Sequence, residues 1–283
     1  MVKIFGYASG NGSEKSGCCM GPLIMQESKF LATNKNLSWV SHLFPADAER
    51  KLDALKGTQA ICTKLAHHTS SAIKDNEKFV VLGGDHSVAI GTWSGVASAL
   101  GGPIGMIWVD AHLDSHTPET SPSKNIHGMA LAALMQQGPK ELTNILADHP
   151  KVAKEHAVII GARDYEPEEV NLLNDLGVTI IFMSEIIEKG LSAAFKKALA
   201  IASSNPNGFG LSIDIDSFEP EFAPATAILT SPGIIPNELS YELKTHIKDN
   251  PKFLGLEIAE FFPDLDKDHL TEAVIASIIN SVF

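Results

Sequence analysis

Short apolar segments rich in β-branched residues alternate with amphipathic segments from about residue 78 to the C-terminus. The apolar segments, which we predict to be strands, span residues 78–82, 104–109, 157–160, 178–182, 208–213 and 253–258. Helical periodicity predicts helices that begin near Ser87 and that cover residues 168–176, 191–203 and 269–279. Such alternation is typical of βαβ units, in which helices cover a parallel sheet. The sequence therefore predicts an α/β fold, with one parallel sheet flanked by helices on both faces.

The length of 283 residues allows either one large domain or two smaller ones. No Pro/Gly/Ser-rich linker, charge block or sustained change of composition separates two halves of the chain. We therefore expect residues 1–283 to form a single α/β domain.

The charge balance limits the classes of partner. With 22 basic and 34 acidic residues, the formal net charge is −12, which disfavours binding to nucleic acid or to anionic membranes. A phosphate-binding loop is also not supported, because residues 83–87 (GGDHS) lack the glycine spacing and the lysine of such loops. Small molecules are the expected partners.

The N-terminal segment has no apolar run of signal-peptide length, and no later stretch approaches the ~20 apolar residues that span a bilayer. The chain has three cysteines. Cys18 and Cys19 are adjacent, which disfavours a disulfide between them, and Cys62 reads as a small buried apolar residue. We expect a cytoplasmic protein without a disulfide framework.

Several metal-capable side chains fall at or just past the ends of predicted strands. They are His86, Asp110, Asp214 and Glu260. Ligands of open α/β sheets bind outside the carboxyl ends of the strands, where loops and helix N-termini converge. These residues are far apart in the sequence, but a parallel sheet would bring them to one edge.

Two short motifs add further candidate ligands. Residues 110–114 (DAHLD) contain Asp110, His112 and Asp114 at alternating positions, which point the same way in an extended segment. Asp214 and Asp216 repeat this spacing after another apolar strand. Taken singly, each motif could instead be a helix cap or a turn, and His86 could be a structural histidine.

Taken together, four aspartates at one sheet edge would repel one another unless cations neutralised them. Two divalent ions balance four aspartate charges, and a ligand set of imidazole and carboxylate suits Mn²⁺, with Co²⁺ or Fe²⁺ as alternatives. Water shared between two such ions loses a proton readily and becomes a nucleophile near neutral pH. The sequence therefore predicts a two-metal hydrolytic site.

The successive motifs GGDHS, DAHLD, NIHG and SIDIDSFEPEFAPAT, together with GARDYEPEE at residues 161–169, resemble the signature blocks of the arginase (ureohydrolase) family. This resemblance implies an arginase-type α/β fold, a binuclear manganese centre, hydrolysis of a guanidinium or related C–N bond, and a homo-oligomer such as a trimer or hexamer. It assigns the first ion to His86, Asp110, Asp114 and Asp214. It assigns the second ion to Asp110, His112, Asp214 and Asp216, with Asp110 and Asp214 bridging.

The resemblance also implies roles around the substrate. The catalytic set is His127 as a proton shuttle, Glu260 as the partner of a guanidinium group, and Asp114. Ser123 and Asn125 match residues that bind an α-carboxylate, whereas Glu166 and Glu169 match acceptors of an α-amino group. His116 belongs to the same substrate shell. The long loop that carries His127 is more similar to arginases than to agmatinases, so L-arginine is the predicted substrate.

Three departures from the arginase pattern fall in that substrate shell. His116 stands where arginases usually carry Asn, Glu166 where they usually carry Asp, and Ala227-Ile228 where they carry Gly-Thr. They leave open a different ureohydrolase, acting on formiminoglutamate, a guanidino acid or agmatine. A metal-binding homologue without catalytic activity is the alternative from another class.

Overall fold

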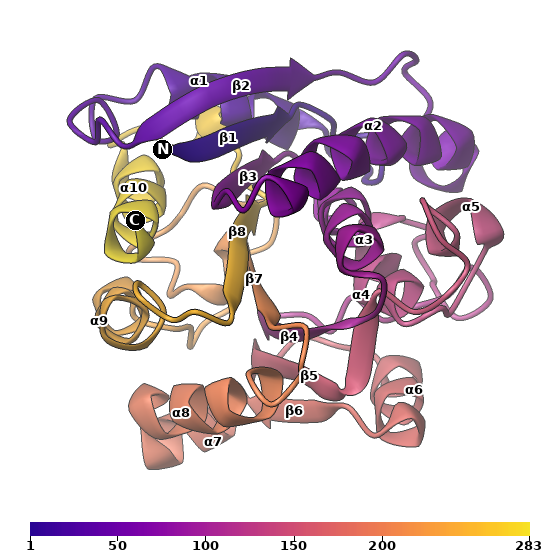
Figure 1. Ribbon diagram of the computed structural model, residues 1–283. Helices are drawn as coiled ribbons and strands as arrows, with labels where there is room; N and C mark the ends of the chain where they lie inside the picture. The colour runs from indigo at the N-terminus through magenta and orange to yellow at the C-terminus, as the bar shows by residue number, and fades with distance from the viewer.

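The computed structural model describes residues 1–283 and contains one sheet of eight strands in the order β2-β1-β3-β8-β7-β4-β5-β6 (Figure 1). Every pair of neighbouring strands is parallel. The strands are β1 (Val2–Tyr7), β2 (Leu37–Leu43), β3 (Phe79–Gly83), β4 (Ile104–Val109), β5 (Val152–Ala162), β6 (Thr179–Phe182), β7 (Phe209–Asp214) and β8 (Phe253–Ala259). The predicted α/β fold class is confirmed.

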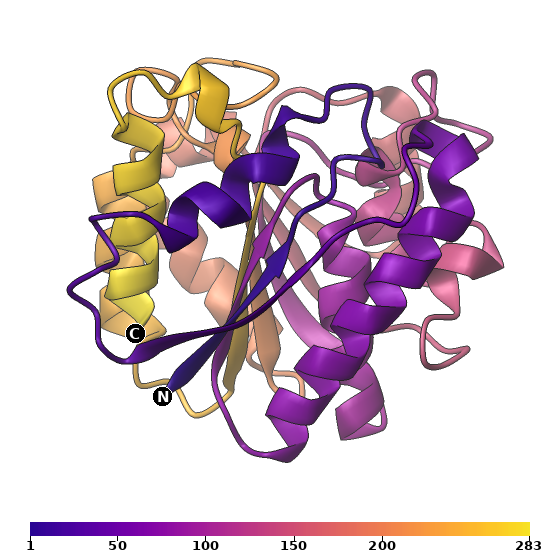
Figure 2. The same cartoon turned by 90° about the horizontal axis from the view of Figure 1, so that it is seen from above.

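Ten α-helices connect and cover these strands. They are α1 (Gly21–Gln26), α2 (Leu55–Lys74), α3 (Val88–Leu100), α4 (Ala130–Leu134), α5 (Lys140–Thr143), α6 (Pro167–Leu176), α7 (Met183–Lys189), α8 (Leu191–Ala202), α9 (Pro236–His246) and α10 (Leu270–Val282). Viewed along the sheet edge, α9 and α10 lie on one side and α2 and α3 on the other (Figure 2). No helix is both long enough and apolar enough to cross a membrane.

Alternation along the strands produces a hydrophobic core on each face of the sheet. In β4, Ile107 packs into the core that includes residues of α8, α9 and α10, whereas its neighbour Trp108 packs into the core that includes α2 and α3. Because successive side chains of a strand point to opposite faces, a continuously apolar strand supplies both cores. This explains why β3, β4 and β7 are buried along their whole length.

All six predicted strands are present, and β4 has the predicted bounds. The largest difference is at β5, which begins at Val152 rather than at residue 157, because the exposed pair Lys154 and Glu155 interrupts its apolar pattern. Strands β1 and β2 were not predicted. β2 lies at the sheet edge with no fully buried residue, so its sequence lacks a strong apolar signal.

The topology places four strand ends side by side. β3, β8, β7 and β4 are consecutive in the sheet. Asp214 is the last residue of β7, and the loops that follow β3, β8 and β4 carry His86, Glu260 and Asp110. Gly84 permits the tight turn after β3, since a Cβ atom at this position would lie 1.9 Å from the carbonyl oxygen of Ser9. The sheet order therefore gathers residues from across the sequence at one edge.

Candidate metal centre

A cavity of about 260 Å³ opens at the carboxyl edge of the sheet. Seven carboxylate residues line it, no lysine or arginine does, and only two of its lining residues are hydrophobic. The carboxylates are Asp114, Asp164, Glu166, Glu169, Asp214, Asp216 and Glu260. A strongly anionic cavity of this kind favours cations, either metal ions or a cationic ligand.

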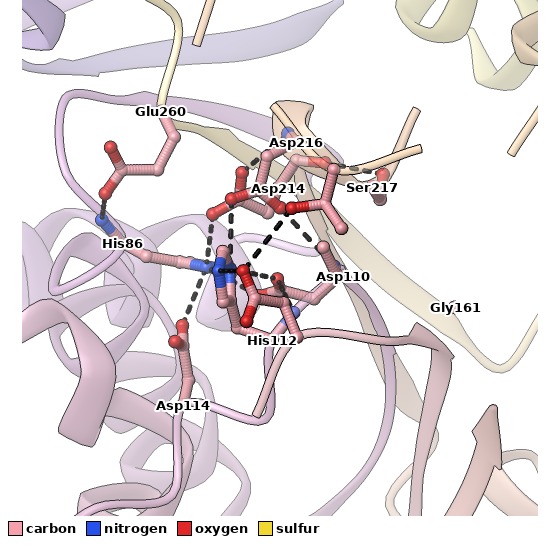
Figure 3. Close-up of polar contacts among 12 residues, drawn as sticks. His86, Asp110, His112, Asp114, Gly161, Asp214, Asp216, Ser217 and Glu260 are labelled. Atoms are coloured by element: carbon pink, nitrogen blue, oxygen red, sulfur yellow. Dashed lines mark hydrogen bonds and ion pairs between the residues drawn. The ribbon is translucent and has the colours of Figure 1, made fainter. Parts of the chain in front are cut away.

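His86 is the centre of a first cluster, in which three carboxylates converge on one ring nitrogen (Figure 3). Its Nδ1 atom lies 3.2 Å from Asp110 Oδ2, 3.0 Å from Asp114 Oδ2 and 3.1 Å from Asp214 Oδ2. The imidazole itself is fully buried. One nitrogen can share a proton with only one of these three oxygens at a time, so hydrogen bonding alone does not account for the arrangement.

His112 forms a second cluster beside the first. Its Nδ1 atom lies 3.0 Å from Asp216 Oδ2 and 3.5 Å from Asp110 Oδ1. Asp110 thus directs Oδ2 to the first cluster and Oδ1 to the second. Asp214 contacts His86 through Oδ2, while its Oδ1 accepts a hydrogen bond of 2.8 Å from the Asp216 amide.

The prediction that Asp110, His112 and Asp114 point the same way along an extended segment is wrong. Asp114 has a left-handed backbone, with φ of 46°, and the segment is not a strand. Asp110 and Asp114 therefore face His86, whereas His112 turns towards Asp216. The three residues still meet around one region, but as members of two clusters.

Burial raises the pKa of Asp114, Asp214 and Asp216, and the neighbouring carboxylate of Asp110 raises each of them further. Burial lowers the pKa of His86, but its carboxylate neighbours raise it to well above the ordinary value. These opposed shifts show that the aspartates need positive charge nearby to stay ionised.

The residues present fit divalent ions. His86 Nδ1 and Asp114 Oδ2 are buried and have no hydrogen-bond partner. Ligands at about 2.1 Å in an octahedron lie about 3.0 Å apart, which agrees with the separations around His86. Two groups, His86/Asp110/Asp114 and Asp110/His112/Asp216, have the composition and proximity to hold a metal ion.

A layer of supporting contacts, which the sequence analysis missed, fixes these side chains. His86 Nε2 lies 2.9 Å from Ser212 Oγ, which donates a hydrogen bond of 2.8 Å to Glu257. The Trp108 ring stacks on His86 at 4.2 Å, and its Nε1 donates to Asp110 Oδ2. Ser212 and Trp108 each lie two residues before a candidate ligand, on the same face of their strands, and this spacing was the available signal.

Arg163 is another functional candidate that was missed. Its guanidinium donates to the backbone carbonyl oxygens of Asp216, at 2.7 Å, and of Thr230, at 2.8 Å. Because the group is held by carbonyl oxygens, it fixes the loop that carries Asp216 without pairing with the Asp216 carboxylate.

His127 and Glu260 lie together at the cavity wall. His127 Nδ1 is 2.8 Å from Glu260 Oε1, which also accepts a hydrogen bond of 2.9 Å from the His86 amide. Burial lowers the pKa of His127, but the Glu260 carboxylate more than compensates and raises it to about 9. Glu260 has a left-handed backbone, with φ of 65°, a conformation that costs of order 1 kcal/mol or more and that is found at functional sites.

The remaining predicted residues line the outer part of the cavity. Ser123 Oγ accepts a hydrogen bond from the Asn125 amide, and Asn125 Oδ1 is buried without a partner. Glu166 and Glu169 stand at the start of α6 and form a capping box with the helix backbone. His116 contacts both of them, at 3.1 Å and 3.5 Å, a contact that the sequence did not predict. Ile228 also lines the cavity and is 44% exposed.

Comparisons with known proteins show the family and the fold. A model of the Arginase family matches residues 1–283. An arginase from Brevibacillus brevis is 33% identical over 294 residues, covering 100% of this chain and 97% of the relative. The solved arginase from Bacillus caldovelox is 31% identical, with a TM-score of 0.93 over 100% of this chain and 97% of that one. A Trypanosoma cruzi formiminoglutamase solved with Mn²⁺ shares the fold at 16% identity, with a TM-score of 0.80 and coverage of 99% and 91%.

Proposed function

The chain belongs to the arginase family of hydrolases, which act on C–N bonds of amidines, and we propose that it is a binuclear manganese enzyme that hydrolyses L-arginine to L-ornithine and urea. One molecule of water is consumed, and the guanidinium carbon leaves in urea. The observation that carries the proposal is the position of Glu260, a fixed carboxylate in the cavity beside two His/Asp clusters.

The metal ligands would be His86, Asp110, Asp114 and Asp214 for one ion, and Asp110, His112, Asp214 and Asp216 for the other. Two observations support this assignment. His86 Nδ1 is buried without a hydrogen-bond partner, and the two oxygens of Asp110 face different histidines, His86 and His112. When bound, two divalent ions supply a water-derived nucleophile near neutral pH and stabilise developing negative charge. Mn²⁺ suits the imidazole and carboxylate donors, and Co²⁺ or Fe²⁺ are the alternatives.

Glu260 would bind the guanidinium group of the substrate. Its Oε1 atom is held by the His86 amide and by His127, so the carboxylate is fixed before substrate arrives. Its second oxygen then remains for a charge-assisted hydrogen bond, which is stronger than a neutral one. Because the carboxylate is already oriented, it can position the guanidinium carbon of the substrate at little entropic cost.

His127 would transfer a proton to the departing amine. Its Nδ1 atom contacts Glu260, which leaves Nε2 for a group in the cavity. The Glu260 carboxylate beside the ring raises the pKa of His127, which favours the protonated form that can act as an acid.

Ser123 and Asn125 would recognise the substrate carboxylate. No lysine or arginine lines the cavity, so we propose that the carboxylate binds through neutral donors, the side-chain amide of Asn125 and the hydroxyl of Ser123. Both Asn125 and Ser123 line the cavity, which supports this proposal.

The test compares L-arginine with agmatine, which lacks the carboxylate. We expect kcat/KM of the Mn²⁺-loaded protein to be at least about tenfold higher for L-arginine, because agmatine lacks the carboxylate that Ser123 and Asn125 would bind, and a hydrogen bond to a charged group contributes about 1.5–3 kcal/mol. Urea release is the measurement, and formamide release from formiminoglutamate and urea release from 4-guanidinobutyrate complete the panel. Equal rates on arginine and agmatine, or activity on formiminoglutamate alone, would refute the arginine assignment. Release of no product from any of them would favour a non-catalytic metal-binding protein.

We further propose a homo-oligomer, with a trimer or hexamer as the expected form, and a cytoplasmic location. All three cysteines are free thiols, which suits a reducing compartment. Light scattering of the purified protein at micromolar concentration measures the assembly, and a monomeric mass would contradict the first of these two proposals.

A further inference from the structure

Three side chains in the outer part of the cavity form a cluster of their own, separate from the two His/Asp clusters. His116 lies in the loop after β4, and Glu166 and Glu169 lie at the N-terminus of α6. His116 Nε2 is 3.1 Å from Glu166 Oε2 and 3.5 Å from Glu169 Oε2. The side chains of His116 and Glu169 are 8% and 4% exposed, so their contact is largely shielded from water, whereas the side chain of Glu166 is 50% exposed.

The backbone already occupies both oxygens of Glu169. Oε1 accepts from the Ser115 amide and Oε2 from the Glu166 amide, each at 3.1 Å. Glu169 therefore joins the loop after β4 to the start of α6. Each oxygen of Glu169 thus already has a backbone donor before a ligand enters the cavity.

His116 is held from its other side as well. Its Nδ1 atom lies 3.1 Å from Thr120 Oγ1, and its amide donates to the Gly128 carbonyl at 3.0 Å. A carboxylate can only accept, so Nε2 carries the hydrogen that points to Glu166. The imidazole is therefore anchored on both sides.

We propose that His116 is a specificity-determining residue that takes the place of a substrate α-ammonium group between Glu166 and Glu169. This inference rests on the proposed function, and it refines the substrate class. The site recognises a guanidinium group and a carboxylate, and gains little from an α-amino group. Guanidino carboxylates without an α-amino group are therefore substrates comparable to L-arginine.

The physical reason is competition for the same acceptors. An α-ammonium group gains most where it meets carboxylates whose lone pairs are free. Here it would have to displace an imidazole that is anchored on both sides, and the Nε2 hydrogen would lose its partner. The loss offsets much of the gain, because a polar group left unpaired costs about as much as a new hydrogen bond contributes.

The experiment measures kcat/KM of the Mn²⁺-loaded protein for L-arginine and for 5-guanidinopentanoate, which is arginine without its α-amino group. We expect the two values to agree within about threefold in the parent. His116→Asn shortens the side chain and frees Glu166, and it should raise the ratio in favour of arginine by tenfold or more. His116→Ala should act in the same direction. His67→Asn, at an exposed position of α2, is the matched control and should leave the ratio unchanged.

A binding measurement separates this inference from the proposed function. Calorimetric titration compares L-ornithine with 5-aminopentanoate, which differ only in the α-amino group, in the same proteins with circular dichroism as the check on folding. We expect similar affinity in the parent and at least tenfold tighter binding of ornithine in His116→Asn. A parent that prefers arginine and ornithine by tenfold, with ratios unmoved by His116→Asn, overturns the role of His116 and leaves the proposed function intact. Absence of both hydrolysis and binding of these four compounds in the parent overturns the two together.

Discussion

His127 and Glu260 form the contact that joins the predicted proton donor to the predicted guanidinium partner. If His127 moves a proton during turnover, His127→Ala should lower kcat by about 100-fold, the usual range for a general acid, with a smaller change in KM. Steady-state urea release measures both constants. A variant with the activity of the parent would show that His127 is only a neighbour of Glu260.

The same contact predicts how stability changes with pH in the metal-stripped protein. Glu260 raises the pKa of His127 to about 9, above the 6.5 of an unfolded chain. The stabilisation is therefore complete below pH 6.5 and is lost as the pH rises through 9. We expect the parent to melt higher than His127→Asn at pH 6, and this difference to vanish near pH 10. A difference that is constant between these pH values would contradict the ion pair.

Sequence patterns predicted which residues at strand ends belong to the site. They did not predict which side chains from distant parts of the chain contact each other. His86, Asp110 and Asp214 follow apolar strands, so their meeting at one edge could be expected. Ser212 supports His86 from 126 positions away, and His116 meets Glu166 from 50 positions away. Neither pairing has a local signature, because it depends on strand order and on rotamers that packing selects.

At the scale of elements, the segment between α5 and β5 depends on one buried lysine. Lys151 is 1% exposed, and its ammonium group donates to the carbonyl oxygens of Thr143, Ala147 and His149 at 2.8, 2.9 and 2.5 Å. One side chain thus closes the loop that leads into β5. It also explains how a lysine can be buried without an acidic partner, since carbonyl oxygens accept all three of its hydrogens.

Lys151→Met should therefore destabilise the protein although it inserts an apolar residue. Three carbonyl oxygens lose their donor, and we expect a loss of about 2 kcal/mol, or roughly 5 °C in melting temperature for a chain of this length. Lys154→Met, at an exposed position of β5, is the matched control. Differential scanning calorimetry of the metal-loaded protein measures both, and equal melting temperatures would show that water replaces the ammonium group.

Three of the elements that the sequence analysis missed have weak sequence signals. β2 contains no fully buried residue, and α4 and α5 have five and four residues, too few to display helical periodicity. By contrast, α10 was predicted over most of its length, because its buried positions recur at helical spacing. The helix α2 was also missed, although it has 20 residues whose buried positions recur at helical spacing, so a weak burial pattern does not account for every missed element.

At the scale of the whole molecule, the site exists because β3, β8, β7 and β4 are consecutive in the sheet. The sequence indicated a parallel sheet but not this order, in which β8 inserts between β3 and β7. The insertion brings Glu260 beside the His86 amide, at 2.9 Å, across 174 positions of sequence. Non-local packing of this kind leaves no periodic trace in the sequence, so the predicted strand end indicated only that Glu260 lies at this edge, and the resemblance of the motifs predicted its role.

The same convergence makes folding and metal binding depend on each other. Four aspartates from two loops meet in a buried region, where burial raises the pKa values of three of them. Ions that bind only the native state stabilise it by mass action, by about 2.7 kcal/mol at a free concentration 100 times Kd. We therefore expect chelation to lower the melting temperature by about 5 to 10 °C, and added Mn²⁺ to restore it.

Asp216→Asn tests whether repulsion among the aspartates causes the loss of stability in the metal-free protein. The variant removes one charge from the cluster, so its metal-free form should melt no lower than the metal-free parent, while its gain on adding Mn²⁺ should shrink. Calorimetric scans before and after chelation, with metal content measured by mass spectrometry, test both statements. A parent whose melting temperature stays constant after confirmed loss of metal would mean that the aspartates are stabilised by the protein alone, and that the two clusters are not linked to folding through bound ions.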